Sequence, residues 1–215
     1  MTTVPTTALP SGEFVSRAGL RAFLVALLAL AIPTGLVALM QGSGGLKLPF
    51  NLFVVDQRLP GIFRLHMLTS GLSLLLIPLV VFTRRDRSWH RPLGRIAALC
   101  VVTGALTSLP VALFSDSVVM ARAGFFAQGI VWLALLTAGI HSIRARKTLD
   151  HAHYMLAMAG VASGAIWVRV TTTAATAWDL PFDQLYSCAA WAGWIVPMMV
   201  AWRFGPGWIS RTQGA

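Results

Sequence analysis

The sequence predicts an all-α integral membrane protein, a bundle of six transmembrane helices with both the N-terminus and the C-terminus in the cytoplasm. Apolar residues make up 56% of the chain and charged residues 11%, a balance that water-soluble domains of this size do not show. Six apolar runs are long enough to cross about 30 Å of hydrocarbon, which takes roughly 20 helical residues. Basic residues are concentrated in connections on one side of these runs, as in loops that stay in the cytoplasm.

The first helix is expected over residues 20–40, where Pro33 is tolerated as a kink because neighbouring helices can satisfy the carbonyl that it frees. A long connection follows over residues 41–63. Its Gly42-Ser43-Gly44-Gly45 run and Pro49 break helices, whereas residues 50–55 are apolar enough to lie in the membrane interface. The sequence therefore predicts one span and then a connection on the outer side.

Five further helices are expected, over residues 64–83, 92–113, 118–142, 151–176 and 184–202. Pro92 suits a first helical turn, since its missing N–H would have no partner there. A Gly205-Pro206-Gly207 break is expected to end the bundle, which leaves residues 205–215 as a short tail. The transmembrane domain then covers residues 17–204. Residues 1–16, rich in Thr and Pro and without a basic start, are expected to be a disordered tail with no cleaved signal peptide.

The formal charge of +10 fixes the predicted orientation. Twelve basic residues fall on one side of the expected spans: Arg17, Arg21, Arg84, Arg85, Arg87, Arg91, Arg95, Arg144, Arg146, Lys147, Arg203 and Arg211. Four fall on the other: Lys47, Arg58, Arg64 and Arg122. By the positive-inside rule the first side is cytoplasmic, as expected of a protein of the bacterial cytoplasmic (inner) membrane. Because these charges lie between apolar runs, the partner that they imply is the lipid bilayer and not nucleic acid.

The histidines are the first candidates for chemistry. Four fall at cytoplasmic helix ends: His90, His141, His151 and His153. His90 and His153 come from two helices at one depth, as a bis-histidine haem b site needs, and Arg95 follows His90 as a further cofactor-binding candidate. His151 and His153 lie about 200° apart around a helix, so at most one of them faces the interior. A structural interpretation, in which these imidazoles are solvated at the interface, stays open, above all for His141 and His151.

A second polar group is expected toward the outer face. Arg169 lies well inside an apolar run, and an intramembrane arginine costs several kcal/mol unless it is paired or faces a cavity. His66, Asp116 and Arg122 are expected within about two turns of that face. One interpretation is an outward-facing pocket for an anion, a quinone head or haem propionates. The other is a structural ion pair, for example Arg169 with Asp116, that fastens two helices together.

Several signatures are missing from the sequence. It contains no His-Glu-x-x-His, no Gly-rich phosphate loop and no Cys-x-x-Cys. With seven Asp and Glu in all, a carboxylate proton relay through the membrane is not expected. Cys100 and Cys188 lie in apolar runs and are interpreted as unpaired. Four glycines are interpreted as close-packing positions between helices: Gly71, Gly104, Gly160 and Gly164.

Several motifs follow one another along the sequence: His66, the His90-Arg91-Pro92-Leu93-Gly94-Arg95 turn, the Trp132 helix, and His153-Tyr154-Met155 followed by Arg169. The order of these motifs resembles a family of bacterial multi-pass membrane proteins catalogued as a domain of unknown function (DUF2306-like). The resemblance covers about residues 64–200, and its most specific part is His-Arg-x-x-Gly-Arg. Where the family has histidine and then Trp-Met, this chain has two histidines, His151 and His153. The resemblance implies a topology and a choice of residues, not an activity. A looser likeness to b-type cytochrome bundles rests on the inner histidines.

Three functions follow as hypotheses. The first is a redox protein that binds one b-type haem near the cytoplasmic face through His90 and His153 and exchanges electrons with a quinone or a protein partner. The second is a non-haem binding, assembly or transport protein whose outer pocket takes an anionic or quinone-like ligand. The third is a membrane enzyme acting on a lipid or isoprenoid with a histidine as general base, which the shortage of carboxylates disfavours.

Helix geometry distinguishes the first two hypotheses. A transporter is expected to contain a helix broken at mid-membrane, for which Pro110 and Pro197 are the sequence hints. A haem protein of this kind is expected to have straight third and fifth helices, with His90 and His153 facing each other across a gap.

Overall fold

The computed structural model describes the backbone of residues 17–213 and, within that range, the side chains of residue 25 and residues 28–205. The predicted tail over residues 1–16 lies outside the described residues. Every regular element in the described part is helical: α1 (Arg17–Ser43), α2 (Phe50–Arg58), α3 (Ile62–Phe82), η1 (Thr83–Arg85), α4 (Arg87–Phe114), α5 (Val119–Arg144), α6 (Thr148–Ala162), α7 (Gly164–Ala177) and α8 (Phe182–Gln213). The prediction of an all-α fold is therefore confirmed.

Five helical segments in the described part are long and apolar enough to cross a membrane. They correspond to the predicted spans from the second to the sixth: Ile62–Arg85, Arg87–Phe114, Val119–Arg144, Thr148–Ala177 and Phe182–Gly205. Of α1, the segment Leu28–Ser43 is a shorter apolar helix. The first predicted span, over residues 20–40, and with it the total of six spans, stays a prediction, as does the cytoplasmic position of both termini.

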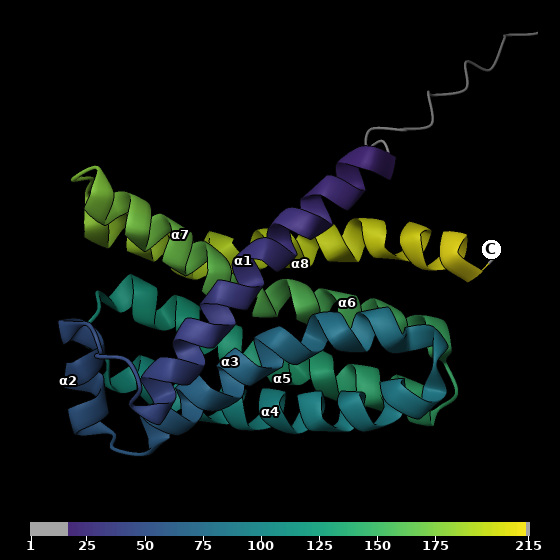
Figure 1. Cartoon of the computed structure of the whole chain (residues 1–215), viewed down its shortest axis with the longest axis horizontal. Helices are drawn as coiled ribbons and strands as arrows, with labels where there is room; N and C mark the ends of the chain where they lie inside the picture. The colour runs from purple at the N-terminus through teal and green to yellow at the C-terminus, as the bar shows by residue number, and fades with distance from the viewer. Residues whose placement is uncertain (1–16, 214–215) are drawn as a thin grey trace, which may run out of the picture.

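The helices α3, α4, α5 and α6 lie side by side along the long axis of the molecule (Figure 1), while α1 crosses over α3, and α7 packs on the first half of α8. We call the end of the bundle that carries α2 the α2 end. The opposite end, which carries η1 and the turn between α5 and α6, is the η1 end. The main core lies between α3, α4, α5, α6 and α8 and is centred on the buried residues Val101, Trp132, Leu136, Val161 and Trp194.

The segment Ser88–Arg95, which the sequence presents as a turn, forms the first two turns of α4. The helix begins earlier than predicted because Asp86 caps it: an Asp86 Oδ1 accepts from Ser88 N–H at 2.9 Å and from Ser88 Oγ–H at 2.6 Å. The chain reverses instead in η1. Pro92 therefore lies in the second turn of α4, so its predicted first-turn position is wrong.

The predicted fifth helix is interrupted at one residue, Ser163, which separates α6 from α7; the backbone of Ser163 keeps right-handed helical angles, and Thr148–Ala177 as a whole is one helix long enough to span a membrane. Two carbonyls beside the break accept from side chains: Ser163 Oγ donates to Gly160 O at 2.7 Å, and Gln128 Nε2 on α5 donates to Val161 O at 3.0 Å. Such side-chain donors are what makes a broken helix tolerable away from water. The two prolines suspected of breaking helices, Pro110 and Pro197, lie inside α4 and α8, both of which continue through them.

The helix α8 continues to Gln213, so the break predicted at Gly205-Pro206-Gly207 is wrong.

The predicted close packing at four glycines is confirmed. A Cβ placed on Gly71 would lie 3.0 Å from Gly35 O, and one on Gly160 would lie 2.8 Å from the Met198 backbone. The corresponding contacts at Gly104 and Gly164 would be 2.8 Å to Ser70 Oγ and 2.6 Å to Gln128 Nε2.

Candidate functional site

His90, in the first turns of α4, is anchored to the neighbouring helix. Its Nδ1 lies 3.0 Å from Val80 O in the last turn of α3. A carbonyl oxygen only accepts, so Nδ1 carries a proton, and Nε2 makes no hydrogen bond with any described residue. Two more histidines repeat this arrangement. Nδ1 of His151 lies 2.8 Å from Gly139 O on α5, and Nδ1 of His66 lies 2.9 Å from Gly104 O on α4.

His153 is bonded differently, through Nε2, which lies 3.0 Å from Trp202 O on α8. Its ring also packs on the indole of Trp202, with 4.3 Å between the ring centroids. His151 and His153 thus reach two different helices, α5 and α8. Among the described residues, no hydrogen bond or ring contact joins His90 to His153, and Arg95 is an exposed side chain of α4.

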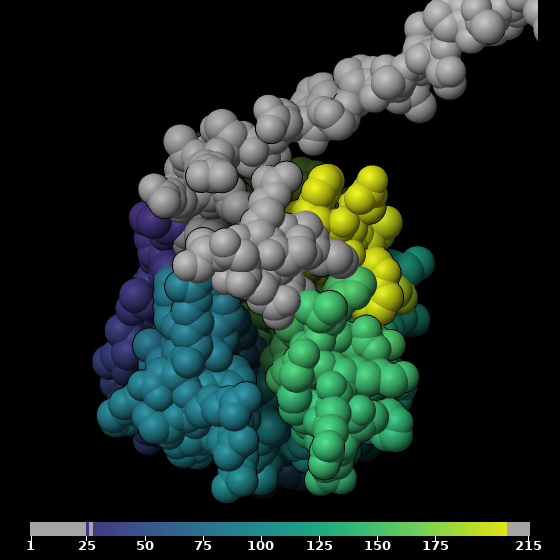
Figure 2. All heavy atoms as spheres, turned by 90° about the vertical axis from the view of Figure 1, so that its right-hand side faces the viewer, coloured from purple at the N-terminus to yellow at the C-terminus, as the bar shows by residue number. Residues whose placement is uncertain are grey.

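Two neighbouring turns stand apart at the η1 end. Figure 2 shows the turn between α3 and α4 and the turn between α5 and α6 as separate lobes with a hollow between them. His90 belongs to the first lobe, and His151 and His153 follow the second. Within the described part of the chain, no three or more His, Cys, Asp or Glu side chains gather as a metal site would require.

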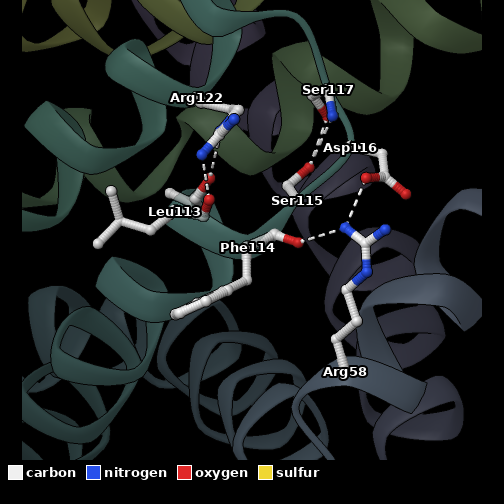
Figure 3. Close-up of polar contacts among 8 residues, drawn as sticks. Arg58, Leu113, Phe114, Ser115, Asp116, Ser117 and Arg122 are labelled. Carbon is white, nitrogen blue, oxygen red and sulfur yellow. Dashed lines mark hydrogen bonds and ion pairs between the residues drawn. The ribbon is translucent and has the colours of Figure 1, made fainter.

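Asp116 and Arg122, two of the predicted outer-pocket residues, hold the connection between α4 and α5 (Figure 3). Arg58 at the end of α2 donates to Asp116 Oδ1 at 2.5 Å and to Phe114 O at 3.1 Å. Arg122 donates to Ala112 O at 3.3 Å and to Leu113 O. The last carbonyls of α4 are thus capped by two arginines, which the negative end of the helix dipole favours.

The suggested structural pair between Arg169 and Asp116 is wrong, because Asp116 pairs with Arg58. Arg169 is half-buried on α7 and forms no ion pair or guanidinium hydrogen bond with the residues that the structure describes. The Nδ1 of His66 is hydrogen-bonded to Gly104 O, and Thr107 Oγ1 lies 3.5 Å from the same nitrogen. Within the described chain no hydrogen bond or ion pair joins any two of the four predicted outer residues. Asp116, His66 and Arg122 bond to other partners, and the Arg169 guanidinium bonds to none of the described residues.

A charged cavity that the sequence analysis did not predict lies at the α2 end, between α2, the end of α1 and the start of α3. It has a volume of about 350 Å³. We call it the α2-end cavity, and its lining residues are Gln41, Gly44, Leu46, Lys47, Leu48, Phe53, Asp56 and Arg64. Asp56 is 4% exposed and accepts from Arg64 twice over, from Nε at 3.2 Å and from Nη2 at 3.0 Å.

Local backbone geometry forms this cavity. The helix α1 ends at Ser43, and Gly44 adopts a positive φ of 83° while its N–H donates to Gln41 O at 3.3 Å. The chain then crosses to α2 and turns again at Gly61, whose φ is 84°, into α3. Asp56 and Arg64, eight residues apart, come face to face across that second turn. In the sequence, the one indication of this site was the position of Asp56, a carboxylate directly after the apolar residues Phe53-Val54-Val55. The sequence analysis treated that segment as an irregular connection.

The fold and the polar ends define a class: a multi-pass helical membrane protein whose spans are linked by histidine, arginine and carboxylate contacts at both ends of the bundle. The chain belongs to the family described as "Predicted membrane protein (DUF2306)", which it matches over residues 63–204. The resemblance seen in the sequence is thereby confirmed. The match includes α4 to α7, nearly all of α3 and α8 as far as residue 204, but not α1 or α2. No curated protein and no solved structure matches the chain.

Proposed function

We propose that the protein binds an anionic ligand in the α2-end cavity and serves as a binding, assembly or transport protein. One observation carries the proposal: two cationic side chains, Lys47 and Arg64, line a cavity in which the one carboxylate, Asp56, is already paired with Arg64. The remaining positive charge favours an anion. This proposal keeps the outer binding function expected from the sequence and moves it to different residues.

Arg64 is positioned to contact a ligand while it holds Asp56. The carboxylate occupies Nε and Nη2, and Nη1 makes no hydrogen bond with any described residue. A Cβ built on Gly44 would lie 3.8 Å from that Nη1, so the backbone of Gly44 passes close to the free donor without obstructing it. The guanidinium is therefore fixed by one anion and offers its remaining N–H groups to a second.

The interruption of the fifth span at Ser163 is the feature of the described chain that most resembles a transporter. In transporters, discontinuous helices form substrate and ion sites near the middle of the membrane. Here α6 and α7 meet at Ser163, close to the tight contact of Gly160 with the Met198 backbone. This separates two segments that pack on different stretches of α8.

The proposal includes an orientation. The described basic residues gather at the η1 end, which carries Arg84, Arg85, Arg87, Arg91, Arg95, Arg144, Arg146, Lys147 and Arg203. By the positive-inside rule this end is cytoplasmic, so the α2-end cavity faces outward from a bacterial inner membrane that six helices cross. A reporter enzyme that works only outside the cytoplasm tests it: activity when inserted after Gly45, and none when inserted after Arg146, is the expected result.

Ligand binding is tested by calorimetry on the detergent-purified full chain with propyl phosphate, a small anion with an apolar tail. The wild-type protein is expected to bind it, and Arg64→Gln to bind it at least tenfold more weakly, since a charge-assisted hydrogen bond contributes about 1.5–3 kcal/mol. Arg122→Gln is the matched control, because Arg122 lies at the same end but bonds to α4 carbonyls. Equal affinity of wild type and Arg64→Gln contradicts the proposal.

Haem binding at the η1 end stays a prediction, with one observation in its favour. His90 donates through Nδ1 to Val80 O, which leaves Nε2 free, as a haem-ligating histidine requires. Of the two candidates on α6, His151 also leaves Nε2 free, whereas His153 uses it for Trp202 O. A reduced-minus-oxidised visible spectrum of wild type, His90→Ala and His153→Ala tests it. A ferrous haem band lost in both variants supports the bis-histidine site and electron exchange with a quinone or protein partner, and a colourless protein after haem addition removes it.

A further inference from the structure

We infer that the ligand of the α2-end cavity is a glycerophosphate-type headgroup, an anion that carries a hydroxyl donor beside its phosphate, and that it belongs to a membrane lipid. This inference rests on the proposed anion-binding function and adds the chemical class of the ligand. It is argued from Gln41, from the cavity size and from the apolar part of the lining.

Gln41, in the last turn of α1, lines the cavity and is 5% exposed. Its Oε1 is sealed from solvent and has no hydrogen-bond partner among the described residues. Buried amide oxygens are nearly always paired, because an unpaired one has lost its water without replacement. The cavity lining therefore includes an acceptor that a donor on the ligand can satisfy once the Gln41 amide turns toward it.

The charge of the lining decides what kind of donor this is. An ammonium group and a hydroxyl both donate to a carbonyl oxygen. Lys47 and Arg64 repel an ammonium and attract the phosphate, so the donor that accompanies the anion is a neutral hydroxyl. A phosphate on Arg64 Nη1 and Lys47, with a hydroxyl on Gln41, engages these three lining side chains at once.

The size and the apolar lining indicate a lipid headgroup. A volume of about 350 Å³ lies at the low end of ligand pockets and is large enough for a headgroup. Leu46 and Phe53 line the cavity yet are 39% and 48% exposed, and Phe50 on the same face of the molecule is 78% exposed. Exposed leucine and phenylalanine beside a polar pocket are expected where acyl chains meet headgroups.

The first experiment compares propyl phosphate with glycerol 3-phosphate, which have similar size and differ in hydroxyl groups. We expect the purified full chain to bind glycerol 3-phosphate about tenfold more tightly, the value of one good hydrogen bond to a buried acceptor. Gln41→Leu is expected to abolish that tenfold preference while it keeps the affinity for propyl phosphate. Gln57→Leu, an exposed amide on α2 outside the cavity lining, is the matched control.

The outcomes separate the two proposals. If neither phosphate binds, the proposed function fails and this inference fails with it. If both bind equally, or if Gln41→Leu keeps the preference, anion binding stands and the assignment of a hydroxyl-bearing headgroup is overturned. An independent readout shows whether Gln41→Leu folds: removal of a buried unpaired oxygen is expected to raise the melting temperature of the ligand-free protein.

The source of the headgroup is tested with lysophosphatidylglycerol, which places the same glycerophosphate on one acyl chain. A lipid-borne ligand is expected to bind at least tenfold more tightly than free glycerol 3-phosphate, because the chain adds apolar contact at Leu46 and Phe53. Equal affinity of the lipid and the free phosphate would overturn the lipid assignment. Lysophosphatidylethanolamine is the control with the ammonium donor, and it is expected to bind more weakly than lysophosphatidylglycerol.

Discussion

His153 donates its Nε2–H to Trp202 O over 3.0 Å, and the residue four positions after Trp202 is Pro206. In an uninterrupted helix the N–H of residue 206 would bond to that carbonyl, and proline has none. The imidazole on α6 replaces the missing donor. This explains why α8 continues past the Gly205-Pro206-Gly207 sequence instead of ending there.

His153→Ala is therefore expected to destabilise the protein by about 1 kcal/mol in the wild-type background, through the loss of one hydrogen bond to a carbonyl without another backbone partner. In a Pro206→Ala background the helix supplies its own N–H, and the same substitution is expected to have close to no effect through this bond. The double-mutant cycle is measured by thermal unfolding in detergent. Equal destabilisation in the two backgrounds would show that His153 acts through another contact.

A second prediction concerns the break between α6 and α7. Gln128 Nε2 donates to Val161 O at 3.0 Å, in the apolar interior of the bundle. Gln128→Leu leaves that carbonyl without its side-chain donor and is expected to destabilise the protein by about 1–2 kcal/mol. Thr137→Val on the same helix is the control, because Thr137 is exposed and bonds to Leu133 O within α5. Thermal unfolding of the two variants checks the difference.

The position of the interruption at Ser163 was not predictable from local sequence, whereas five of the six spans were. Length and hydropathy located the spans because a membrane helix must be apolar over a fixed length. The break depends on Gln128, which lies 33 residues before Val161, and on Gly164, where a Cβ would meet the Gln128 side chain. Proline content, by contrast, suggested Pro110 and Pro197, where the helices continue.

The outer pocket expected from the sequence stays a prediction, and the α2-end cavity is lined by other residues. Of the four residues named for that pocket, none lines this cavity. Asp116 and Arg122 did not form it, since the carbonyls at the end of α4 and the nearby Arg58 gave them closer partners. Asp56 was missed because its burial depends on how α2 folds back over α3, which no local pattern encodes.

A third prediction concerns pH and the start of α4. Hydrogen bonds from the Ser88 hydroxyl and then the Ser88 N–H hold the pKa of Asp86 below its ordinary value. Because the pKa is lowered on folding, this cap contributes stability above the ordinary aspartate pKa and loses it as the pH falls through the lowered value. Asp86→Ala is expected to reduce the melting temperature at neutral pH by roughly 2–4 °C.

Asp86→Asn is the informative partner of that variant, since asparagine keeps a side-chain oxygen for Ser88 but does not titrate. The difference in melting temperature between Asp86→Asn and Asp86→Ala is expected to be the same at neutral and acidic pH. The difference between the wild type and Asp86→Ala is expected to shrink as the solution is acidified. Melting curves across the acidic range check this. A wild-type advantage that is unchanged in acid would show that the carboxylate charge does not stabilise the cap.

The last prediction separates the structural role of Arg64 from its role in binding. Asp56 is 4% exposed, so Arg64→Gln leaves a buried carboxylate without its cation and is expected to lower the melting temperature of the protein. Asp56→Asn with Arg64→Gln removes both charges and is expected to recover most of that stability, because no buried charge is left unpaired. Thermal unfolding in detergent measures this part.

Anion binding is expected to behave in the opposite way. In the proposed complex, propyl phosphate contacts Arg64 and not Asp56. The double variant is therefore expected to bind it as weakly as Arg64→Gln does, although the double variant recovers most of the stability of the wild type. Asp56→Asn alone keeps the guanidinium and adds net positive charge to the α2-end cavity, which is expected to preserve or strengthen the affinity. Recovery of binding in the double variant would mean that the loss in Arg64→Gln came from unfolding of the cavity and not from loss of a contact with the anion.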